Sequence, residues 1–562
     1  MLRLSPRTIA LATRDRLVRQ GLHPLLAQVY AGRGIGDRAE LDYPLAQLID
    51  PAQMLGAGDA AGLLADLLQR RARMMVVADF DCDGATTCAV AVRALRAFGA
   101  EVDFLVPNRF EYGYGLTPEI VALAATNKPD LIITVDNGIA SHDGVDAARA
   151  LGIQTLITDH HLPAATLPAA ACIVNPNQPG CPFPSKSIAG VGVVFYVMLA
   201  LRSELRRRGW FSDQRVEPNL AHLLDLVALG TVADVVRLDR NNRILVSQGV
   251  ARIQQMKTAP GIAALFRVAG RSLHRATTND LAFQLAPRLN AAGRLSDMQR
   301  GIDCLLTEHG GEAWRMAQEL DALNQERRSI EQEMAEGAAR ILDQLETRER
   351  HGVALFDPNW HQGVVGILAG RLRERLHRPV IAFARCGEDT LKGSGRSIPG
   401  LHLRDALDLV AKREPGLLRR FGGHAGAVGV LIGETDFGRF QSSFDAVVET
   451  LLAPEDLHNR VETDGTAEPQ YLNLQVAQLL EREVWGQGFP RPLFVDEFQV
   501  EQQRLLQDKH LKLRLSRDGF RFDAIRFNDA MPLPATARLA YRLSVNEFNG
   551  TSSAQLVVEQ RG

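Results

Sequence analysis

The chain has little cysteine and no long apolar segment. It holds six cysteines in 562 residues, none arranged as Cys-x-x-Cys, so we expect neither a disulfide framework nor a thiolate zinc site. The longest apolar run, residues 188–201, is too short to span a bilayer and contains two glycines, which favours a buried helix. The N-terminus also lacks the sustained apolar core of a signal peptide. These absences predict a cytoplasmic protein with no membrane association.

An excess of charge of either sign is also missing. The 64 Lys and Arg residues against 66 Asp and Glu give a net charge of −2, which argues against a protein that coats nucleic acid indiscriminately. An enzyme that acts on nucleic acid would therefore need a local basic track. The hydrophobic content of 46% is that of an ordinary globular protein, and the length predicts three or four domains.

Acidic residues and histidines follow three short apolar runs, at residues 74–77, 131–135 and 155–157. The first is followed by Asp79, Asp81 and Asp83, the second by Asp136, and the third by Asp159-His160-His161. The runs are spaced as parallel strands joined by helical crossovers. Because functional groups gather at the carboxyl ends of such strands, five carboxylates and two imidazoles should meet at one edge of a sheet.

This concentration of negative charge needs cations to neutralise it. Carboxylates with one or two imidazoles suit Mn²⁺ or Mg²⁺, and we expect two ions. The alternation of an extended segment would place Asp79, Asp81 and Asp83 on one side. It would also turn His160 and His161 in opposite directions, so that the two do different work. The plain alternative is that these are solvated turn residues after strands.

The order of these motifs resembles the DHH phosphoesterase superfamily, which is named after the triplet at Asp159-His160-His161. Further segments match that family's pattern and its associated domain: residues 229–236, 287–294, 361–366, 393–397 and 422–425. As a set, at this length, they are most similar to the bacterial single-strand-specific exonucleases of the superfamily. The resemblance covers roughly residues 40–550 and is specific only in combination.

The resemblance implies roles for the residues of the first cluster. The implied metal ligands are Asp81, Asp83, Asp136, His160 and Asp234. Asp79 is a weaker ligand or a supporting carboxylate. His161 is placed at the phosphate oxygens as a donor or proton carrier, and Asp159 orients an imidazole. Two metals about 3.5–4 Å apart would then hydrolyse a phosphodiester.

Several other residues are candidates for binding the substrate. Arg288, Asn290 and Arg294 belong to one family motif, and arginine offers a fork-shaped donor for phosphate. Ser394 and Arg396, with His424, lie in glycine clusters that we expect to form anion-binding nests of backbone N–H groups. Arg109 and Tyr114 lie in a loop that could grip a terminal phosphate or stack a base. Simple turns and a structural loop are the alternatives.

The expected architecture is α/β throughout, with a β-rich end. A helical segment (1–70) precedes a DHH-type parallel-sheet domain (71–311). A long connecting helix (312–350), with one apolar stripe at helical spacing, leads to a second α/β domain (351–455) of the DHH-associated type. The resemblance implies that DNA threads between these two domains and that residues 456–562 form an OB-fold.

A predicted hairpin near the C-terminus alternates polar and apolar residues on both sides of Arg517-Asp518-Gly519. One face is apolar, and we expect the other to carry Lys512, Arg514, Arg521 and Arg526 towards nucleic acid. A plain amphipathic hairpin explains the same pattern, and only the OB-fold of the resembling family favours DNA.

The predicted function is single-strand-specific 5′→3′ exonuclease activity that releases 5′-mononucleotides in DNA repair and recombination. Polarity and products are implied by the resemblance alone, as is a single-stranded-DNA-binding protein as partner. A monomer is expected. The alternatives are a DHH phosphodiesterase acting on short oligonucleotides or cyclic dinucleotides, and a non-catalytic single-strand-binding scaffold. Chain length opposes the first alternative, and the complete set of acidic residues opposes the second.

Overall fold

The computed structural model describes residues 3–108, 111–112, 115–344, 350–548 and 550–561. These residues form two compact units. The larger unit combines Arg7–Asn324 with Asp464–Arg561, and the smaller combines the N-terminal strand with Gln325–Thr463. The division falls inside the long helix α14, whose bounds are Gly310–Gln344. The sequence predicted this helix within a few residues at its start.

A parallel five-stranded sheet lies at the centre of the larger unit, with strand order β3-β2-β4-β5-β6 in the described part of the chain. The strands are β2 (Arg73–Ala78), β3 (Glu101–Leu105), β4 (Leu131–Val135), β5 (Gln154–Thr158) and β6 (Cys172–Val174). The three strands predicted from apolar runs are β2, β4 and β5, and they are direct neighbours.

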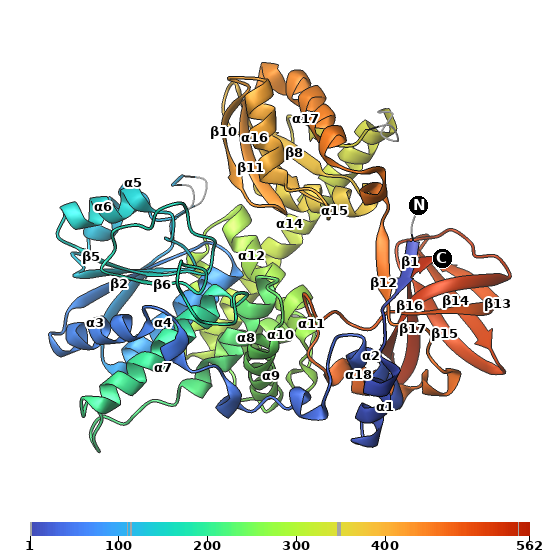
Figure 1. The fold of residues 1–562 in the computed structure, drawn as a ribbon, viewed down its shortest axis with the longest axis horizontal. Coiled ribbons are helices and arrows are strands. Elements are labelled where there is room, and N and C mark those ends of the chain that lie inside the picture. Colours follow the sequence, from blue (N-terminus) through green and yellow to red (C-terminus); the bar gives the residue numbers. More distant parts are fainter. Residues whose placement is uncertain (1–2, 109–110, 113–114, 345–349, 549, 562) are drawn as a thin grey trace. The chain divides into compact units, whose positions relative to one another are not determined.

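Helices cover both faces of this sheet (Figure 1). Val76 and Ile133 point to the face covered by α3, α4 and α7, whereas Val77 and Ile132 point to the face covered by α5 and α6. The bounds are α3 (Ala57–Gln69), α4 (Cys82–Phe98), α5 (Pro118–Ala125), α6 (His142–Ala150) and α7 (Gly190–Arg207). Burial on both faces explains why the strands read as continuous apolar runs.

A group of helices follows the sheet in the chain and extends the same core. Its members are α8 (Leu224–Ala233), α9 (Arg240–Gln254), α10 (Pro260–Val268), α11 (Thr278–Asp280), α12 (Ala286–Leu295) and α13 (Gln299–Leu306). A π-helical segment, Leu281–Leu285, leads directly into α12. The buried helix predicted from residues 188–201 is α7, and Val191 and Val193 on it have no exposed surface.

The smaller unit is a mixed sheet with helices, in the strand order β10-β11-β9-β8-β7. Its strands are β7 (Val353–Phe356), β8 (Val380–Arg385), β9 (Thr390–Arg396), β10 (Leu418–Gly423) and β11 (Ala427–Gly433). Its helices after α14 are α15 (Val365–Leu376), α16 (Leu403–Arg413) and α17 (Phe437–Leu451). This is the second α/β domain that the sequence predicted.

The C-terminal part of the larger unit is a closed barrel of strand order β13-β14-β15-β17-β16, as an OB-fold requires. The strands are β13 (Phe494–Leu506), β14 (His510–Arg517), β15 (Phe520–Arg526), β16 (Thr536–Phe548) and β17 (Thr551–Arg561), and α18 (Leu474–Arg482) precedes them. The predicted hairpin is β14–β15.

The sequence suggested that the N-terminal segment is helical throughout, but the structure shows that it begins with a strand. Arg3–Pro6 forms strand β1, which pairs in parallel with β12 (Arg460–Thr463) in the smaller unit. Helices α1 (Leu11–Arg19) and α2 (Pro24–Ala31) follow in the larger unit. There Arg33 forms a buried ion pair with Asp464, 2.5 Å apart, which fastens this segment to the chain entering the barrel. The prediction of a helical segment over residues 1–70 missed β1, because a four-residue strand has too little pattern to be recognised.

Candidate metal centre

The carboxyl ends of β2, β4 and β5 bring their polar loops to one edge of the sheet. Asp79 follows β2, Asp136 follows β4, and Asp159 follows β5, each in the first position after its strand. The backbone pairing continues into these loops, since the Asp136 N–H donates to the Thr158 carbonyl at 3.0 Å. Asp234 arrives from elsewhere, at the C-terminal end of α8. The predicted convergence of three strand ends is therefore confirmed.

The segment from Asp79 to Asp83 is not extended, contrary to the prediction. Asp81 caps helix α4, and its Oδ1 accepts the Gly84 N–H at 3.0 Å, which places Asp83 in the first helical turn. The prediction extended the strand beyond its true end at Ala78. It did so because the Asp-x-x-Gly pattern after a strand can also begin a helix, with Asp as the N-cap. The three carboxylates still lie at the centre, but a turn and the start of α4 place them there, and not the side-chain alternation of a strand.

Helix α12 holds this turn from outside. The Asn290 Oδ1 accepts the Cys82 N–H at 2.7 Å, and a Cβ on Gly293 would lie 1.9 Å from the Phe80 carbonyl oxygen. The backbone of α12 can approach so closely only because that residue is glycine. Asn290, predicted to contact substrate, is thus placed as a support for the acidic turn.

Asp83 is buried at the N-terminus of α7. Its two oxygens accept the backbone N–H groups of Gly190 at 2.7 Å and Val191 at 3.1 Å. The helix dipole favours a carboxylate at this position, as do the N–H groups of the first turn, which have no partner within the helix itself. Gly190 also leaves room for Asp136, because a Cβ there would lie 2.6 Å from the Asp136 Oδ1.

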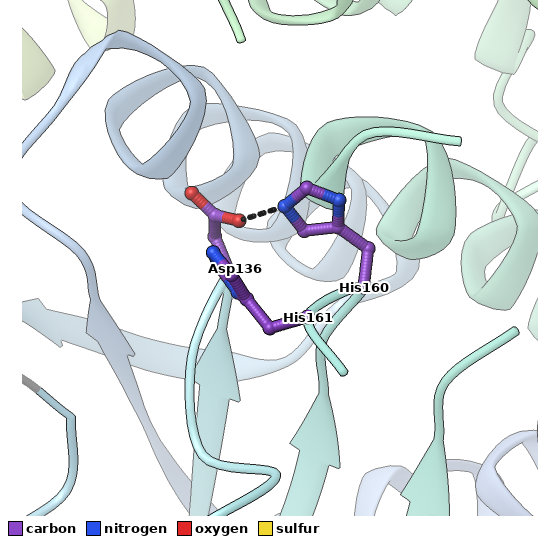
Figure 2. Close-up of side chains that lie close together, drawn as sticks. All are labelled: Asp136, His160 and His161. Atoms are coloured by element: carbon purple, nitrogen blue, oxygen red, sulfur yellow. Dashed lines mark ion pairs between the residues drawn. The ribbon is translucent and has the colours of Figure 1, made fainter. Parts of the chain in front are cut away.

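Asp136 and His160 face one another across the centre (Figure 2). The His160 Nε2 lies 3.1 Å from the Asp136 Oδ1 and 3.5 Å from the Asp234 Oδ2. Both the His160 Nε2 and the Asp234 Oδ2 are buried, and neither has a hydrogen-bond partner within the described residues. Buried polar atoms are normally satisfied, so this pair of atoms fits a cation that both would coordinate.

Two further features mark the centre as one built for cations. The ligand atoms of Asp79, Asp81 and Asp136 lie within 4.8 Å of one another, as do those of Asp83, His160 and Asp234, and those of Asp136, His160 and His161. Asp136 and His160 each belong to two of these groups. Asp136 also has a φ of 62°, a left-handed conformation that a non-glycine residue adopts at some cost in energy.

Burial and mutual repulsion raise the pKa values of the carboxyl groups. Burial first, and then the charge of Asp81, raise the pKa of Asp83 to about 7. The pKa values of Asp136 and Asp234 rise well above the usual range for the same reasons. Burial lowers the pKa of His160 to about 4, which keeps its imidazole neutral and able to bind a metal. The centre without cations therefore favours protonated carboxyl groups.

His161 has a different environment from His160. Its Nδ1 lies 2.7 Å from the Asp159 Oδ1, and its side chain is 46% exposed against 12% for His160. Burial would lower the pKa of His161, but the hydrogen bond and charge of Asp159 outweigh it and raise the pKa to about 9. Asp159 therefore orients an imidazole, and that imidazole is His161.

Two asparagines that sequence reasoning missed fix the histidine backbone. Asn175 donates its Nδ2–H to the His161 carbonyl at 2.9 Å, and Asn177 donates to the His160 carbonyl at 2.6 Å. Both follow β6, the next strand in the sheet after β5. Two asparagines directly after a strand were a signal that could have placed them at this edge.

Arg288 lies on α12 but is turned into the protein. It is 6% exposed, its Nε donates to Asp321 at 2.8 Å, and it also contacts the Gln284 carbonyl. This geometry corrects the prediction that its guanidinium is available to phosphate, because its ion pair is internal to the larger unit. Arg294, near the end of the same helix, is half-buried.

The glycine cluster at residues 393–397 of the smaller unit is not a nest. Residues 393–396 belong to β9, whose backbone pairs with β8 on one side and β11 on the other, so their N–H groups are already used. Gly393 and Gly395 permit close packing, since a Cβ on Gly393 would lie 2.5 Å from the Phe383 ring. The alternation leaves Ser394 and Arg396 on the opposite face. There the Arg396 Nη1 lies 3.3 Å from the Ser394 Oγ.

His424 lies beyond the end of β10 and is exposed, and its Nδ1 accepts the Gly426 N–H at 3.2 Å. The connection that carries it meets the end of β9, where the Ser397 N–H donates to the Gly426 carbonyl at 3.0 Å. Arg109 and Tyr114 lie outside the described residues.

The barrel hairpin carries the predicted basic face with one exception. Lys512 and Arg514 are exposed on the outer face of β14, while Leu511, Leu513 and Leu515 are buried. Arg526 faces the other way, because it shares its side of β15 with Phe522 and Ala524, and its side chain is only 13% exposed. Its assignment to the basic face was therefore wrong by one step of the strand alternation.

Three family models match the chain. The DHH family N-terminal domain matches residues 73–231, the DHHA1 domain residues 350–450, and the RecJ OB domain residues 463–560. The single-stranded-DNA-specific exonuclease RecJ of Escherichia coli K12 is 50% identical over 96% of both chains. That of Haemophilus influenzae is 46% identical over the same share.

Solved structures agree with these matches. The crystal structure of RecJ in complex with Mn²⁺ from Thermus thermophilus is 31% identical, with a TM-score of 0.83, covering 100% of this chain and 79% of that one. The Mg²⁺ complex of the same protein has a TM-score of 0.77 at 29% identity, with coverage of 100% and 78%. Among the described residues, no helix has the length and apolar character needed to cross a membrane.

Proposed function

The chain belongs to the RecJ family of DHH proteins, and on that basis we propose that it is a metal-dependent exonuclease specific for single-stranded DNA. Two relatives with that name are 50% identical to this chain, and each match covers 96% of both chains. The observation that carries the proposal is the buried cluster of carboxylates and one neutral imidazole, in which Asp136 and His160 are each shared between two groups of ligand atoms.

The cluster would hold two Mn²⁺ or Mg²⁺ ions through Asp79, Asp81, Asp83, Asp136, His160 and Asp234. When bound, the two ions supply a hydroxide at neutral pH and neutralise charge on the scissile phosphate. Asp136 has the central position expected of a bridging carboxylate. Asp83, already fixed by two backbone N–H groups, keeps lone pairs for coordination.

His161 acts on the substrate. Its imidazole is fixed by Asp159 through Nδ1, and the hydrogen bond and charge of Asp159 raise its pKa to about 9 against the effect of burial. Its Nε2–H is the group that donates to a phosphate oxygen or to the leaving oxygen. Asn175 and Asn177 keep both histidines in place by holding their carbonyl groups. In the smaller unit Ser394, Arg396 and His424 contact the phosphate backbone, and Lys512 and Arg514 on the barrel contact the strand further from the centre.

The direction of digestion is 5′→3′, the products are 5′-mononucleotides, and the activity serves DNA repair and recombination in the cytoplasm. The protein works as a monomer and takes single-stranded-DNA-binding protein as a partner. These parts of the proposal are supported by the family resemblance and not by any distance in the structure.

Digestion of end-labelled oligonucleotides tests the proposal. With Mn²⁺ or Mg²⁺ we expect single strands to be degraded from the 5′ end to mononucleotides and blunt duplexes to survive. Activity confined to dinucleotides or short oligonucleotides would favour the smaller DHH phosphodiesterases. Binding without digestion at any metal concentration would favour a non-catalytic scaffold.

The central carboxylate provides the matched variant. Asp136→Ala should abolish hydrolysis and leave DNA binding and thermal stability nearly unchanged, because it removes a shared ligand and also relieves repulsion among buried carboxylates. Nuclease activity within about tenfold of the wild-type rate would contradict the two-metal assignment.

A further inference from the structure

Two aliphatic residues that are next in the chain to residues of the metal centre have exposed side chains. Val235 directly follows Asp234 and is 62% exposed, and Leu162 directly follows His161 and is 75% exposed. The two segments meet at the centre, where the His160 Nε2 lies 3.5 Å from the Asp234 Oδ2. Two segments that carry charged and polar groups of the centre therefore each continue into an exposed side chain that can make only apolar contacts.

Val235 is held in a backbone conformation that its side chain disfavours. Its φ is 60°, in the left-handed region, and among the described residues with positive φ it is the one with a β-branched side chain. Helix α8 ends at Ala233 with Asp234 as its cap, so Val235 occupies the position where helices most often end on glycine. A valine here is strained where a glycine would not be.

The folded chain gains little from this strain. The Val235 side chain is mostly in solvent, whereas the next residue, Val236, is partly buried and packs against the core. Strained residues of this kind are concentrated at functional sites, where the surrounding structure holds them for a purpose other than packing. The left-handed turn leaves an exposed isopropyl group one residue from a candidate metal ligand.

We propose that Val235 and Leu162 form an apolar ledge that packs against the base of the terminal nucleotide while the metal centre holds its phosphate. This inference rests on the proposed function, since a nucleotide is the ligand whose phosphate belongs at the centre and whose planar base is attached a short distance away. Aliphatic contact makes no hydrogen bonds to base edges, so the ledge would position any of the four bases. Val235 and Leu162 are positioning residues in this scheme.

The test replaces each aliphatic group by a polar one of similar size. Asparagine tolerates the left-handed region, so Val235→Asn should keep or raise the melting temperature, and Leu162→Asn changes only an exposed side chain. Val216→Asn is the matched control, because Val216 is 78% exposed and lies beyond the C-terminal end of α7. That helix begins at the centre with Gly190, and its 18 residues span about 27 Å.

Each variant is assayed with Mn²⁺ on two single strands, one ordinary and one in which the nucleotides at both ends lack a base. On the ordinary strand kcat/KM should fall about fivefold to tenfold for Val235→Asn and Leu162→Asn, and stay unchanged for Val216→Asn. On the strand without terminal bases, the kcat/KM of the wild type should be lower than on the ordinary strand by a similar factor. On that strand the kcat/KM of each variant should equal that of the wild type within about twofold.

The outcomes separate this inference from the proposed function. Variants that match wild type on the ordinary strand, or that lose the same factor on both strands, overturn the ledge. Wild-type protein that degrades neither strand contradicts the proposed function instead. If Val235→Asn unfolds, Leu162→Asn alone decides between these results.

Discussion

At the scale of single residues, His160 and His161 are neighbours in the chain with opposite environments. His160 is buried between Asp136 and Asp234, and burial lowers its pKa to about 4. His161 is half-exposed on Asp159, which raises its pKa to about 9 despite the opposing effect of burial. A neutral imidazole is a metal ligand, and a protonated one is a donor to phosphate. The difference arises because burial dominates at His160, whereas the hydrogen bond and charge of Asp159 outweigh burial at His161.

This difference predicts distinct defects in two variants. His161→Ala should lower turnover by a factor of about 10²–10⁴, the usual effect of one positioned donor or acid, with little change in metal affinity. His160→Ala should lose activity through weaker metal binding, partly recovered at high Mn²⁺. Titrating Mn²⁺ into both variants measures this. If excess Mn²⁺ rescues His161→Ala and not His160→Ala, the two roles are reversed.

The carboxyl groups of the centre predict how stability depends on pH. In metal-free protein the folded-state pKa of Asp83 is about 7 and those of Asp136 and Asp234 are also raised, whereas an unfolded Asp titrates near about 3.9. The folded state therefore binds more protons than the unfolded state between these values, and stability falls as pH rises through this window.

Bound cations take the place of those protons, so the stabilisation by Mn²⁺ should grow with pH. We expect the melting temperature of EDTA-treated protein to fall between pH 5 and pH 8, and the gain on adding Mn²⁺ to be larger at pH 8. The Asp136→Ala variant is the control, since it has lost a repelling carboxylate and should show a shallower pH dependence. An equal gain from Mn²⁺ at both pH values would contradict the proposed ligands.

At the scale of elements, α12 supports the acidic turn through one side chain. Replacing Asn290 by Ala leaves the Cys82 N–H without its acceptor, which should lower the free energy of unfolding by about 1–3 kcal/mol. Because the turn carries Asp81 and Asp83, the Mn²⁺ concentration needed for half-maximal activity should also rise.

A matched variant separates the two effects of this substitution. Gln254→Ala removes a comparable hydrogen bond, from the Gln254 Nε2 to the Ala276 carbonyl at 2.8 Å, in the same unit but away from the turn. It should lower the melting temperature and leave the Mn²⁺ requirement unchanged. If Asn290→Ala behaves in the same way as Gln254→Ala, then α12 supports the fold and not the metal centre.

Elements with a strong periodic pattern were predictable from sequence, and glycine-rich ones were not. Residues 131–135 coincide with β4, and the buried faces of that strand explain its apolar run. Residues 393–396 looked like a loop because glycine is typical of turns, yet they form β9. The reason lies in packing against Phe383 on β8, a contact across the sheet that no local pattern contains.

The candidate site was predictable in its members but less so in their surroundings. Strand ends and the family motifs together indicated the acidic residues and both histidines. Asn290 and Arg288 belong to the same matching motif, but one supports a backbone turn and the other pairs with Asp321. Which partner a polar side chain takes depends on helices that meet only in the fold, so the sequence could not separate these supports from direct contacts.

At the scale of the whole molecule, nucleic-acid affinity has to come from local basic surface, because the net charge is −2. The outer face of the barrel hairpin is less basic than its sequence suggested. Arg514 pairs with Asp523 at 3.2 Å and Arg521 with Glu501 at 3.0 Å. Within the described part of the chain no ion pair involves Lys512. One lysine is thus the principal unpaired cation of this face.

The barrel face predicts how binding to single strands depends on salt. With Ca²⁺ in place of Mn²⁺ to suppress digestion, the affinity for single strands should fall steeply with salt. Lys512→Ala should reduce the magnitude of the slope of log affinity against log salt by about 0.7, the loss of one phosphate contact.

Replacing Lys512, Arg514 and Arg521 together should flatten the slope further, because Asp523 and Glu501 then face the strand unpaired. Cleavage of very short oligonucleotides should be spared, since these do not reach the barrel. Lys128→Ala is the control, as Lys128 lies before β4 begins, at the edge of the sheet opposite the metal centre. An unchanged slope in the triple variant, measured by fluorescence anisotropy, would mean that the hairpin serves the fold alone.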